Sequence, residues 1–359
     1  MHILICGEGR AEIHEDSWAQ GLRALGHEVE LLRWEPLFRA SRFRALSLAR
    51  KTQNKLLWGP ALWRLNERLV VRAHASRPDA IILYRPTHVW PVTVRYLRES
   101  LPETTIATYN NDDPFGPRAF APLWRHYLAG VPYAHVHMVY RAENVERLRA
   151  MGASDVHVVR SAFLPERHRP IALTDEERAR FGADVVFVGH FEPDARVEQL
   201  EALATSGVDL ALFGPDWERA PRLPWLERFQ PIRMLTGDDY VRAIAASRIA
   251  LCFLSTLNRD TYTRRCFEIP AIGTMLLCQR TADMEQLFRP GIEADYFSDA
   301  NELVEKVRHY LAHPDEQARI AAAGHARVHS AGHDITSRMR EVEGILAAAL
   351  ARRRSKSRG

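Results

Sequence analysis

Short apolar segments rich in β-branched residues alternate with segments of helical periodicity along the chain, and this alternation constrains the fold more than any other feature. Parallel strands need a crossover between them, so strands that alternate with helices predict parallel sheets with helices on both faces. In the first half, we expect strands at 2–6, 28–32, 80–84, 104–109, 135–139 and 156–159. We expect helices near 16–25, 44–76, 89–100, 118–129 and 142–150.

A proline-containing, charge-rich segment at 164–170 interrupts this pattern and predicts a linker between two domains. The alternation then starts again, with strands expected at 185–189, 208–213, 249–254, 274–278 and 294–297 and helices at 299–312, 315–330 and 336–351. A chain of 359 residues with 46% hydrophobic content can bury two cores. We therefore predict an α/β fold of two Rossmann-like, doubly wound parallel-sheet domains, residues 1–165 and 166–335.

Composition indicates a folded protein of a reducing compartment. No segment approaches 18 uncharged apolar residues, and Met1 leads directly into an apolar strand, so we expect neither a spanning helix nor a secretory signal. The four cysteines, Cys6, Cys252, Cys266 and Cys278, sit singly inside apolar runs, with no close pair suited to zinc or redox chemistry. We expect buried thiols in a cytoplasmic protein.

The net charge of +4 is unevenly distributed. Residues 33–77 carry eleven Lys or Arg against two Glu, with Trp and Phe interleaved, and the last eight residues carry five more cations. This pattern is typical of helices that rest on an anionic membrane surface. The alternative is an amphipathic helix pair with an apolar core face and solvated arginines. No nucleic-acid-binding motif is present, so nucleic acid is not an expected partner.

The segment 263–273 places Arg264, Arg265 and Glu268 at the start of an apolar helix. The helix dipole and the arginines attract an anion, and the carboxylate can accept from two sugar hydroxyls. This is the chemistry that holds a nucleotide diphosphate. Asp260 lies eight positions before Glu268, so two carboxylates span the loop and the helix start. The alternative is an i,i+4 ion pair between Arg264 and Glu268 on a solvated face.

Ligands of open parallel sheets bind beyond the carboxyl ends of the strands. After the first strand, Gly7 and Gly9 would let the backbone approach a phosphate, but no third glycine follows at the spacing typical of nicotinamide dinucleotides. After the fourth strand, Asp112 and Asp113 are candidates for a general base or a hydroxyl-binding group, or for an Asx turn. His14, in the loop after the first strand, is a second candidate base.

Two strand ends in the second half finish in glycine followed by a polar residue. Gly189 precedes His190, which is a candidate donor to a phosphate or an exposed turn histidine. Gly214 precedes Trp217, whose ring is placed to stack on a base.

Histidines recur at 325, 329 and 333, but Gly332 ends the helix and no carboxylate or cysteine completes a ligand set. His135 and His137 share one strand face, where packing is the simpler interpretation. We expect no tightly bound metal.

The second half resembles the C-terminal domain of the CgeB-like (spore maturation protein type) glycosyltransferases. The matching positions are Arg-x-Phe-Glu-Ile at 265–269, Ala271, Gly273, Glu293, Phe297, Glu302-Leu303, Tyr310-Leu311, Ala321 and 324–328. A weaker likeness extends through Gly189, 213–217 and 112–114. The resemblance implies the GT-B fold, with two facing Rossmann-like domains, the donor held mainly by the second, the acceptor by the first, and the C-terminal helix 336–359 completing the first.

The resemblance also implies residue roles. Glu268 would bind the ribose hydroxyls, Arg265 and Arg264 would neutralise the diphosphate, and Gly189-His190 would pass along the phosphates. Asp260 falls where the first acid of the paired-acid motif touches the donor sugar, with Asp in place of the usual Glu. No metal cofactor is implied.

These features predict a glycosyltransferase that moves a sugar from a nucleoside-diphosphate sugar such as a UDP sugar to a hydroxyl-bearing acceptor: a cell-envelope or lipid-linked glycan, or a small molecule. The acids at 260 and 268 favour retention of configuration, whereas Asp112 or Asp113 as a base suits inversion. Residues 33–77 and the basic tail predict contact with the inner face of the membrane. The alternatives are a sugar-nucleotide epimerase on the same fold, and a non-catalytic membrane-surface or nucleotide-binding protein.

Overall fold

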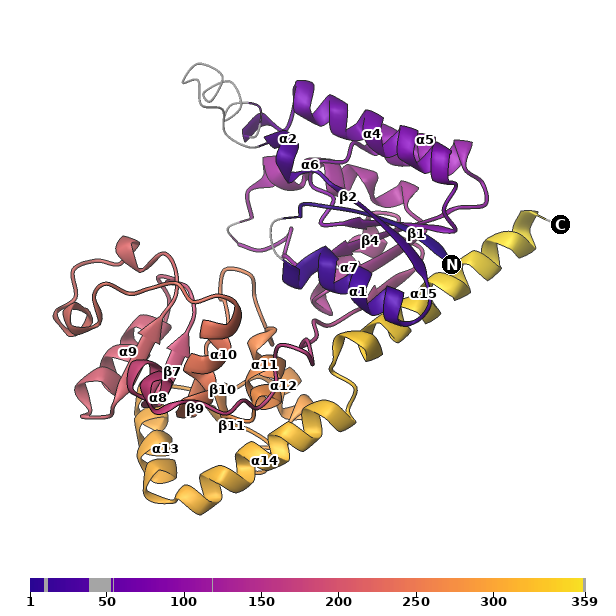
Figure 1. The fold of residues 1–359 in the computed structure, drawn as a ribbon. Coiled ribbons are helices and arrows are strands. Elements are labelled where there is room, and N and C mark those ends of the chain that lie inside the picture. The colour runs from indigo at the N-terminus through magenta and orange to yellow at the C-terminus, as the bar shows by residue number, and fades with distance from the viewer. Residues whose placement is uncertain (10–11, 39–52, 54, 118, 358–359) are drawn as a thin grey trace. The chain divides into compact units, whose positions relative to one another are not determined.

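The chain folds into two compact units, one formed by Met1–Arg160 with Ile335–Gly359 and the other by Ser161–Asp334 (Figure 1). The computed structural model describes residues 1–9, 12–38, 53, 55–117 and 119–357. Each unit contains one parallel sheet, and every strand expected from the sequence is present. The predicted α/β fold class with two parallel-sheet domains is confirmed.

The sheet of the first unit has six parallel strands in the order β2-β1-β3-β4-β5-β6. They are β1 (His2–Gly7), β2 (Glu28–Arg33), β3 (Ala80–Tyr84), β4 (Thr105–Asn110), β5 (Val136–Val139) and β6 (Val156–Val158). The strands β3, β4 and β5 are buried along their whole length. This explains why β3 reads as a continuous apolar run rather than as an alternating one, whereas β4 and β5 also bury polar residues such as Thr108 and His137.

Helices cover both faces of this sheet. They are η1 (Glu12–Asp16), α1 (Ser17–Ala24), α2 (Glu35–Phe38), α4 (Pro60–Ser76), α5 (Pro91–Ser100), α6 (Ala121–Gly130), η2 (Val131–Tyr133), α7 (Glu143–Ala150) and α15 (Ile335–Ser357). In Figure 1, α4 and α5 lie on one face and α1 and α15 on the other. The helix predicted at 44–76 corresponds to α4 from Pro60 onward, and its portion at 44–52 and 54 lies outside the described residues.

The C-terminal helix α15 belongs to the first unit and packs against α1. Gly21 of α1 makes this contact so close that an added Cβ would lie 2.6 Å from Met339 Cγ and 3.2 Å from the Ile335 carbonyl oxygen. A glycine in the middle of a helix lowers the stability of that helix. Here the close approach of α15 explains why a glycine is present.

The sheet of the second unit has five parallel strands in the order β11-β10-β9-β7-β8. They are β7 (Ala183–Val188), β8 (Leu210–Phe213), β9 (Ser247–Cys252), β10 (Met275–Gln279) and β11 (Asp295–Phe297). The helices are α8 (Asp175–Phe181), α9 (Arg196–Thr205), η3 (Trp217–Arg219), η4 (Pro224–Phe229), α10 (Gly237–Ala245), α11 (Arg265–Ile272), α12 (Ala282–Leu287), α13 (Ala300–Ala312) and α14 (Pro314–Ser330).

Six helices of this unit were not predicted from the sequence: the α-helices α8, α9, α10 and α12 and the short η3 and η4. Two of them carried a readable signal. Thr174 and Glu177 form a capping box at the start of α8, and Asp238 and Asp239 occupy the first turn of the amphipathic α10.

Strand order fixes where each unit can bind a ligand. In the first unit the chain runs from β1 to β2 and returns to β3 on the other side of β1. In the second it runs from β7 to β8 and returns to β9 on the other side of β7. In each unit the two connections leave the first strand on opposite sides, so the strand order reverses between β1 and β3 and between β7 and β9. Open parallel sheets bind ligands at the carboxyl ends of the strands at such a switch point. The candidate sites are therefore the ends of β1 and β3 and the ends of β7 and β9.

Candidate donor and acceptor sites

The loop after β9 leads into α11 at the switch point of the second unit. Residues 266–272 of the helix are buried, which anchors it against the sheet, and Gly273 ends it in the left-handed conformation at φ +94°. Arg264 and Arg265, both partly exposed, stand at its N-terminal end, where the helix dipole adds positive potential. Asp260 lies half-exposed in the loop, and its N–H donates to the Ser255 carbonyl at 2.9 Å.

The carboxylate of Glu268 is almost completely buried in the first turn of α11. Tyr240 of α10 donates its hydroxyl to Glu268 Oε2 at 2.6 Å. His168 Nε2 lies 3.6 Å from Oε1, and Arg264 Nε lies 4.0 Å from the same oxygen. The i,i+4 pair between Arg264 and Glu268 is thus present, but the expectation that it lies on a solvated face is wrong, because Glu268 faces the core.

Two of the groups around Glu268 are held in their neutral forms. Burial, with the adjacent carboxylate of Glu268, raises the pKa of Tyr240 well above its usual value, so its hydroxyl remains a donor. Burial lowers the pKa of His168. Its Nδ1 accepts from the Leu164 N–H at 3.0 Å, which places the proton on Nε2, toward Glu268. Sequence analysis missed both residues, because they join Glu268 only through tertiary contacts.

Gly189 and Gly214 are required by the close approach of two strand ends. A Cβ on Gly214, at φ +145°, would lie 1.9 Å from the Gly189 carbonyl oxygen. That oxygen accepts from the indole N–H of Trp217 at 3.0 Å. Trp217 is only 2% exposed and its ring packs in the core, so the prediction that it stacks on a base is wrong; it shapes the turn instead.

His190 begins a charged network across the switch point. Its Nε2 lies 2.6 Å from Glu192 Oε1, and Arg196 contacts Glu192 at 3.1 Å and Asp194 at 2.8 Å. Burial would raise the pKa of Glu192, but hydrogen bonds from His190 and Ser255 and the charge of Arg196 lower it to about 2. Because Ser255 follows β9, this network ties the end of β7 to the end of β9.

In the first unit, the glycines after β1 surround a carboxylate of the protein itself. Gly9 donates its N–H to Glu15 Oε1, and a Cβ on Gly7 would lie 2.5 Å from the same oxygen. Glu15 is 1% exposed, and burial raises its pKa. The prediction that Gly7 and Gly9 approach a phosphate is corrected, because Glu15 already holds the Gly9 amide.

Arg85 links the other groups at this edge. It follows β3 with an unusual φ of +47°, and its guanidinium reaches Asp112 at 2.7 Å and Glu8 at 3.3 Å. Asp113 is buried and accepts from the Phe115 N–H at 3.0 Å, which is an Asx turn, so its candidacy as a base is withdrawn. His14 Nδ1 lies 3.3 Å from the Tyr84 hydroxyl, and its ring is partly exposed.

Side chains of the basic segment 33–77 divide between the core and the surface. Leu62, Leu65 and Leu69 form the buried face of α4, as the amphipathic-helix alternative predicts. Trp58 and Trp63 remain 71% and 56% exposed. Residues 39–52 and 54 of the segment lie outside the described residues.

The C-terminal arginines are engaged with the first unit. Arg352 pairs with Asp155, Arg353 donates to the Pro102 carbonyl, and Arg354 lies 3.7 Å from Asp79. The described part of the tail therefore docks α15. No helix among the described residues combines the length and apolarity needed to cross a bilayer.

The three histidines at 325, 329 and 333 have separate packing roles. His325 Nδ1 contacts the Pro270 carbonyl at 3.0 Å, the His329 ring meets Phe163, and the buried His333 ring lies 4.6 Å from Phe267. His137 is also buried, between Thr108 and the Val131 carbonyl.

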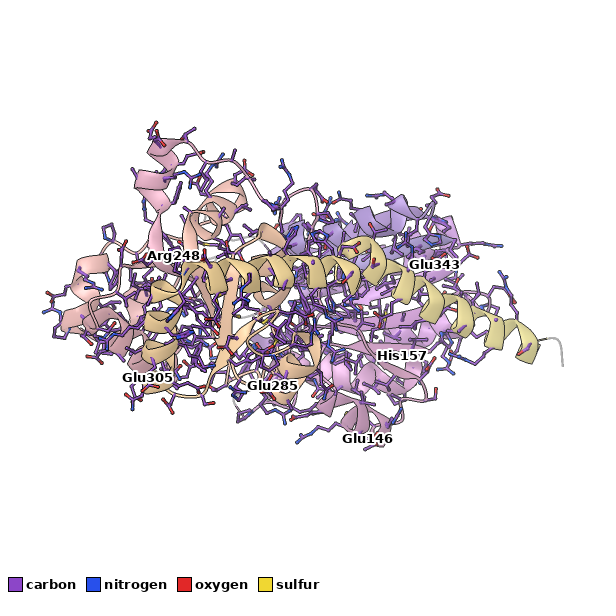
Figure 2. The ribbon with its side chains drawn as sticks, turned by 90° about the horizontal axis from the view of Figure 1, so that it is seen from below. Glu146, His157, Arg248, Glu285, Glu305 and Glu343 are labelled. Carbon is purple, nitrogen blue, oxygen red and sulfur yellow. The ribbon has the colours of Figure 1, made fainter. Side chains whose placement is uncertain are left out.

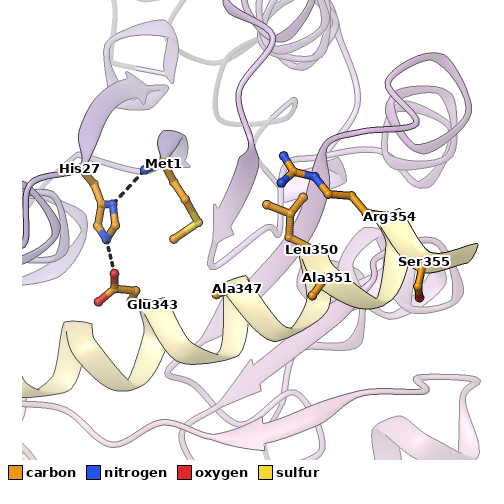
Figure 3. A pocket seen from close by; sticks show the side chains of 8 residues that line it. All are labelled: Met1, His27, Glu343, Ala347, Leu350, Ala351, Arg354 and Ser355. Carbon is orange, nitrogen blue, oxygen red and sulfur yellow. Dashed lines mark hydrogen bonds and ion pairs between the residues drawn. The ribbon is translucent and has the colours of Figure 1, made fainter. Parts of the chain in front are cut away.

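A pocket of about 680 Å³ opens between α15 and the amino end of β1 (Figure 3). There His27 bridges the amino group of Met1 and Glu343, at 3.1 Å to each. This pocket is at the opposite edge of the sheet from the switch point, so it is not a candidate donor or acceptor site.

Residues 196–344, from α9 into α15, match the family model described as glycosyl transferase-like. Sucrose-phosphate synthase from Thermosynechococcus elongatus aligns over 98% of this chain and 99% of its own, with a TM-score of 0.69 and 12% identity. Anabaena HepE, solved in complex with UDP, aligns over 97% of this chain and all of its own, with a TM-score of 0.65 and 13% identity. The chain has the GT-B fold.

Among curated proteins, a GDP-mannose-dependent alpha-mannosyltransferase from Mycobacterium tuberculosis (strain CDC 1551 / Oshkosh) is 24% identical over 233 residues. The alignment spans 61% of this chain and 60% of that relative.

Proposed function

We propose that this chain is a glycosyltransferase that binds a nucleoside-diphosphate sugar at the carboxyl edge of its second sheet and transfers the sugar to a hydroxyl-bearing acceptor. One observation carries the proposal: Arg264 and Arg265 stand at the N-terminal end of α11, beside the anchored carboxylate of Glu268, at the switch point of this sheet. The glycosyl transferase-like match over 196–344 includes this helix, and HepE, of the same fold, was solved with UDP and with UDP-glucose.

The chemistry of transfer explains the charges. When the bond between the anomeric carbon and the phosphate oxygen breaks, the leaving nucleoside diphosphate gains negative charge. Arg264, Arg265 and the helix dipole stabilise that charge without a metal ion. Glu268 keeps acceptor capacity for the ribose hydroxyls, because Tyr240 uses only one of the roughly four lone-pair positions of a carboxylate.

The first unit supplies the acceptor side of the proposal. Asp112, oriented by Arg85, is the candidate base for the acceptor hydroxyl, with His14 as the second candidate. A base there predicts inversion, whereas the carboxylates of Asp260 and Glu268 in the second unit predict retention. The anomeric configuration of the product, read by NMR, decides between them. We also propose that the chain belongs to the CgeB-like glycosyltransferases, which its second half resembles.

A transfer assay tests the function. Donors labelled in the sugar, UDP-glucose and GDP-mannose first, are incubated with glycan, lipid-linked and small-molecule acceptors. We expect label to move from the nucleotide to an acceptor, and Arg265→Ala to lower the rate at least tenfold through loss of a charged contact to the leaving group. Arg248→Ala is the control, since Arg248 lies at the amino end of β9 (Figure 2). Label that stays on the nucleotide as a sugar isomer would identify an epimerase instead.

We also propose contact with the inner, anionic face of the membrane through the exposed Trp58 and Trp63 and the neighbouring cations of α4, such as Arg64 and Arg68. Vesicle sedimentation tests it. Vesicles with phosphatidylglycerol should bind the protein, vesicles of phosphatidylcholine should not, and Trp63→Ser should weaken binding. Equal sedimentation of the variant and the wild type would remove this part of the proposal.

A further inference from the structure

Three of the four cysteines meet beneath the first turn of α11. Cys252 Sγ lies 3.6 Å from Cys266 Sγ, which lies 3.9 Å from Cys278 Sγ, and all three atoms are within 4.8 Å of one another. All three are free thiols and fully buried. The expectation of buried thiols is confirmed, and three cysteines that sit singly in the sequence come together in the fold. Cys252 and Cys278 are register partners on β9 and β10, and α11 places Cys266 above them.

These spacings match a trigonal thiolate site. Three sulfurs that each lie about 2.3 Å from a central ion in one plane are about 4.0 Å apart. The observed separations of 3.6 and 3.9 Å need only small adjustments to reach that arrangement. Among the described residues, no histidine or carboxylate joins this group as a fourth ligand. Three soft donors without a fourth favour Cu(I), which accepts three-coordination, over Zn²⁺, which almost always takes four ligands in structural sites.

The surroundings suit a negatively charged metal–thiolate centre. The Thr263 N–H points to Cys266 Sγ at 3.5 Å, as amide groups do toward thiolate ligands. The guanidinium groups of Arg265 and Arg196 both lie close enough to interact electrostatically with Cys252. Two cations therefore face the charge that three thiolates and one monovalent ion would create.

We propose that Cys252, Cys266 and Cys278 form a binding site for a thiophilic monovalent metal ion, Cu(I), in the core of the second unit. On binding, three S–H bonds break, three Cu–S bonds form, and three protons pass to solvent, with no change of oxidation state. The site takes no part in the chemistry of the proposed sugar transfer, although Arg265 lies near both, and its test involves no donor or acceptor. Its failure would leave the proposed function untouched.

The test is an anaerobic titration of the reduced, full-length protein with Cu(I) in competition with a chromophoric Cu(I) chelator. We expect one equivalent to be withdrawn from the chelator, slowly, because the thiols are buried. X-ray absorption of the loaded wild type should show three sulfurs and no nitrogen in the first coordination shell. Two sulfurs, or any nitrogen, would overturn the proposal without reliance on a variant.

Matched variants locate the ion. Cys252→Ser and Cys278→Ala should each weaken Cu(I) binding at least a hundredfold, with folding checked by thermal unfolding. Cys6→Ser, a buried cysteine of the first unit, should bind Cu(I) as the wild type does. The exposed group of His309, His313 and Glu316 is the competing metal site. Loss of Cu(I) binding in His309→Ala but not in Cys252→Ser would overturn the proposal.

Discussion

Glu15 and Glu268 are buried carboxylates at the carboxyl edges of their sheets, and each is held by a donor from the protein itself. Glu15 accepts from the Gly9 amide and Glu268 from the Tyr240 hydroxyl. Burying a carboxylate costs free energy unless hydrogen bonds replace those it made with water. The donors from Gly9 and Tyr240 provide part of that compensation.

Glu15→Gln tests the cost of the buried charge in the first unit. Burial raises the pKa of Glu15, so its contribution to stability is fully present below the unfolded value of 4.5 and is lost as the pH rises through the folded pKa. Glutamine keeps an oxygen for Gly9 and carries no charge. We expect the variant to gain free energy of unfolding at pH 7 and to lose that advantage below pH 4.5, in urea unfolding at both values. A larger gain at low pH than at pH 7 would contradict this assignment.

Tyr240→Phe tests the support of Glu268. Loss of a hydrogen bond to a charged group should lower the free energy of unfolding by roughly 1.5–3 kcal/mol and weaken nucleotide-sugar binding. Tyr310→Phe is the matched control, because Tyr310 donates to Asp295 at the same 2.6 Å distance in the same unit, away from the switch point. Both variants should lose stability, and only Tyr240→Phe should lose affinity in calorimetry. Equal affinity in the two variants would argue against Glu268 as a donor contact.

At the scale of elements, helix α15 is tied to α1 by a contact that needs glycine. Gly21→Ala should lower the free energy of unfolding by about 1–3 kcal/mol, because its methyl group would collide with Met339 and approach the Ile335 carbonyl. Gly344→Ala makes the same substitution within α15, where an added Cβ meets nothing within 4 Å. It should stabilise by about 1 kcal/mol through helix propensity. Chemical denaturation of both variants checks the contrast, and a stabilised Gly21→Ala would disprove the close packing.

The positions of the strands were also the part of the structure that the sequence predicted best. Buried parallel strands such as Ala80–Tyr84 consist of continuous apolar residues, so their presence is readable from the chain alone. The cations at 264–265 and the glycines at 189 and 214 are readable in the same way, and they lie at the edge of the second sheet where we propose that the donor binds. Side chains that act through tertiary contacts were not readable: His168 and Tyr240 reach Glu268 from other elements. Trp217 was misplaced because its ring turns into the core rather than toward solvent.

For the whole molecule, buried histidines predict sensitivity to acid. Burial lowers the pKa of His137 to about 4 from the usual 6.5. Between these two values the unfolded chain binds a proton at this residue and the folded protein does not. Stability should therefore fall as the pH drops below about 6.5, by up to about 3 kcal/mol for this residue. Burial lowers the pKa of His135 as well, to about 3, and adds to the same trend. His137→Gln should show a shallower decline in unfolding free energy between pH 7 and pH 5, and an unchanged slope would contradict this origin.

The central claim is that the second unit binds a nucleoside diphosphate at the N-terminus of α11. Calorimetric titration tests it most directly, with UDP, GDP, ADP and dTDP as ligands and with wild type, Arg265→Ala and Arg248→Ala as the proteins. We expect one nucleotide to bind the wild type and Arg248→Ala with equal affinity and Arg265→Ala roughly 10- to 100-fold more weakly, as the loss of a charged hydrogen bond predicts. Binding that survives intact in Arg265→Ala, or that fails for every nucleotide in the wild type, would contradict the claim.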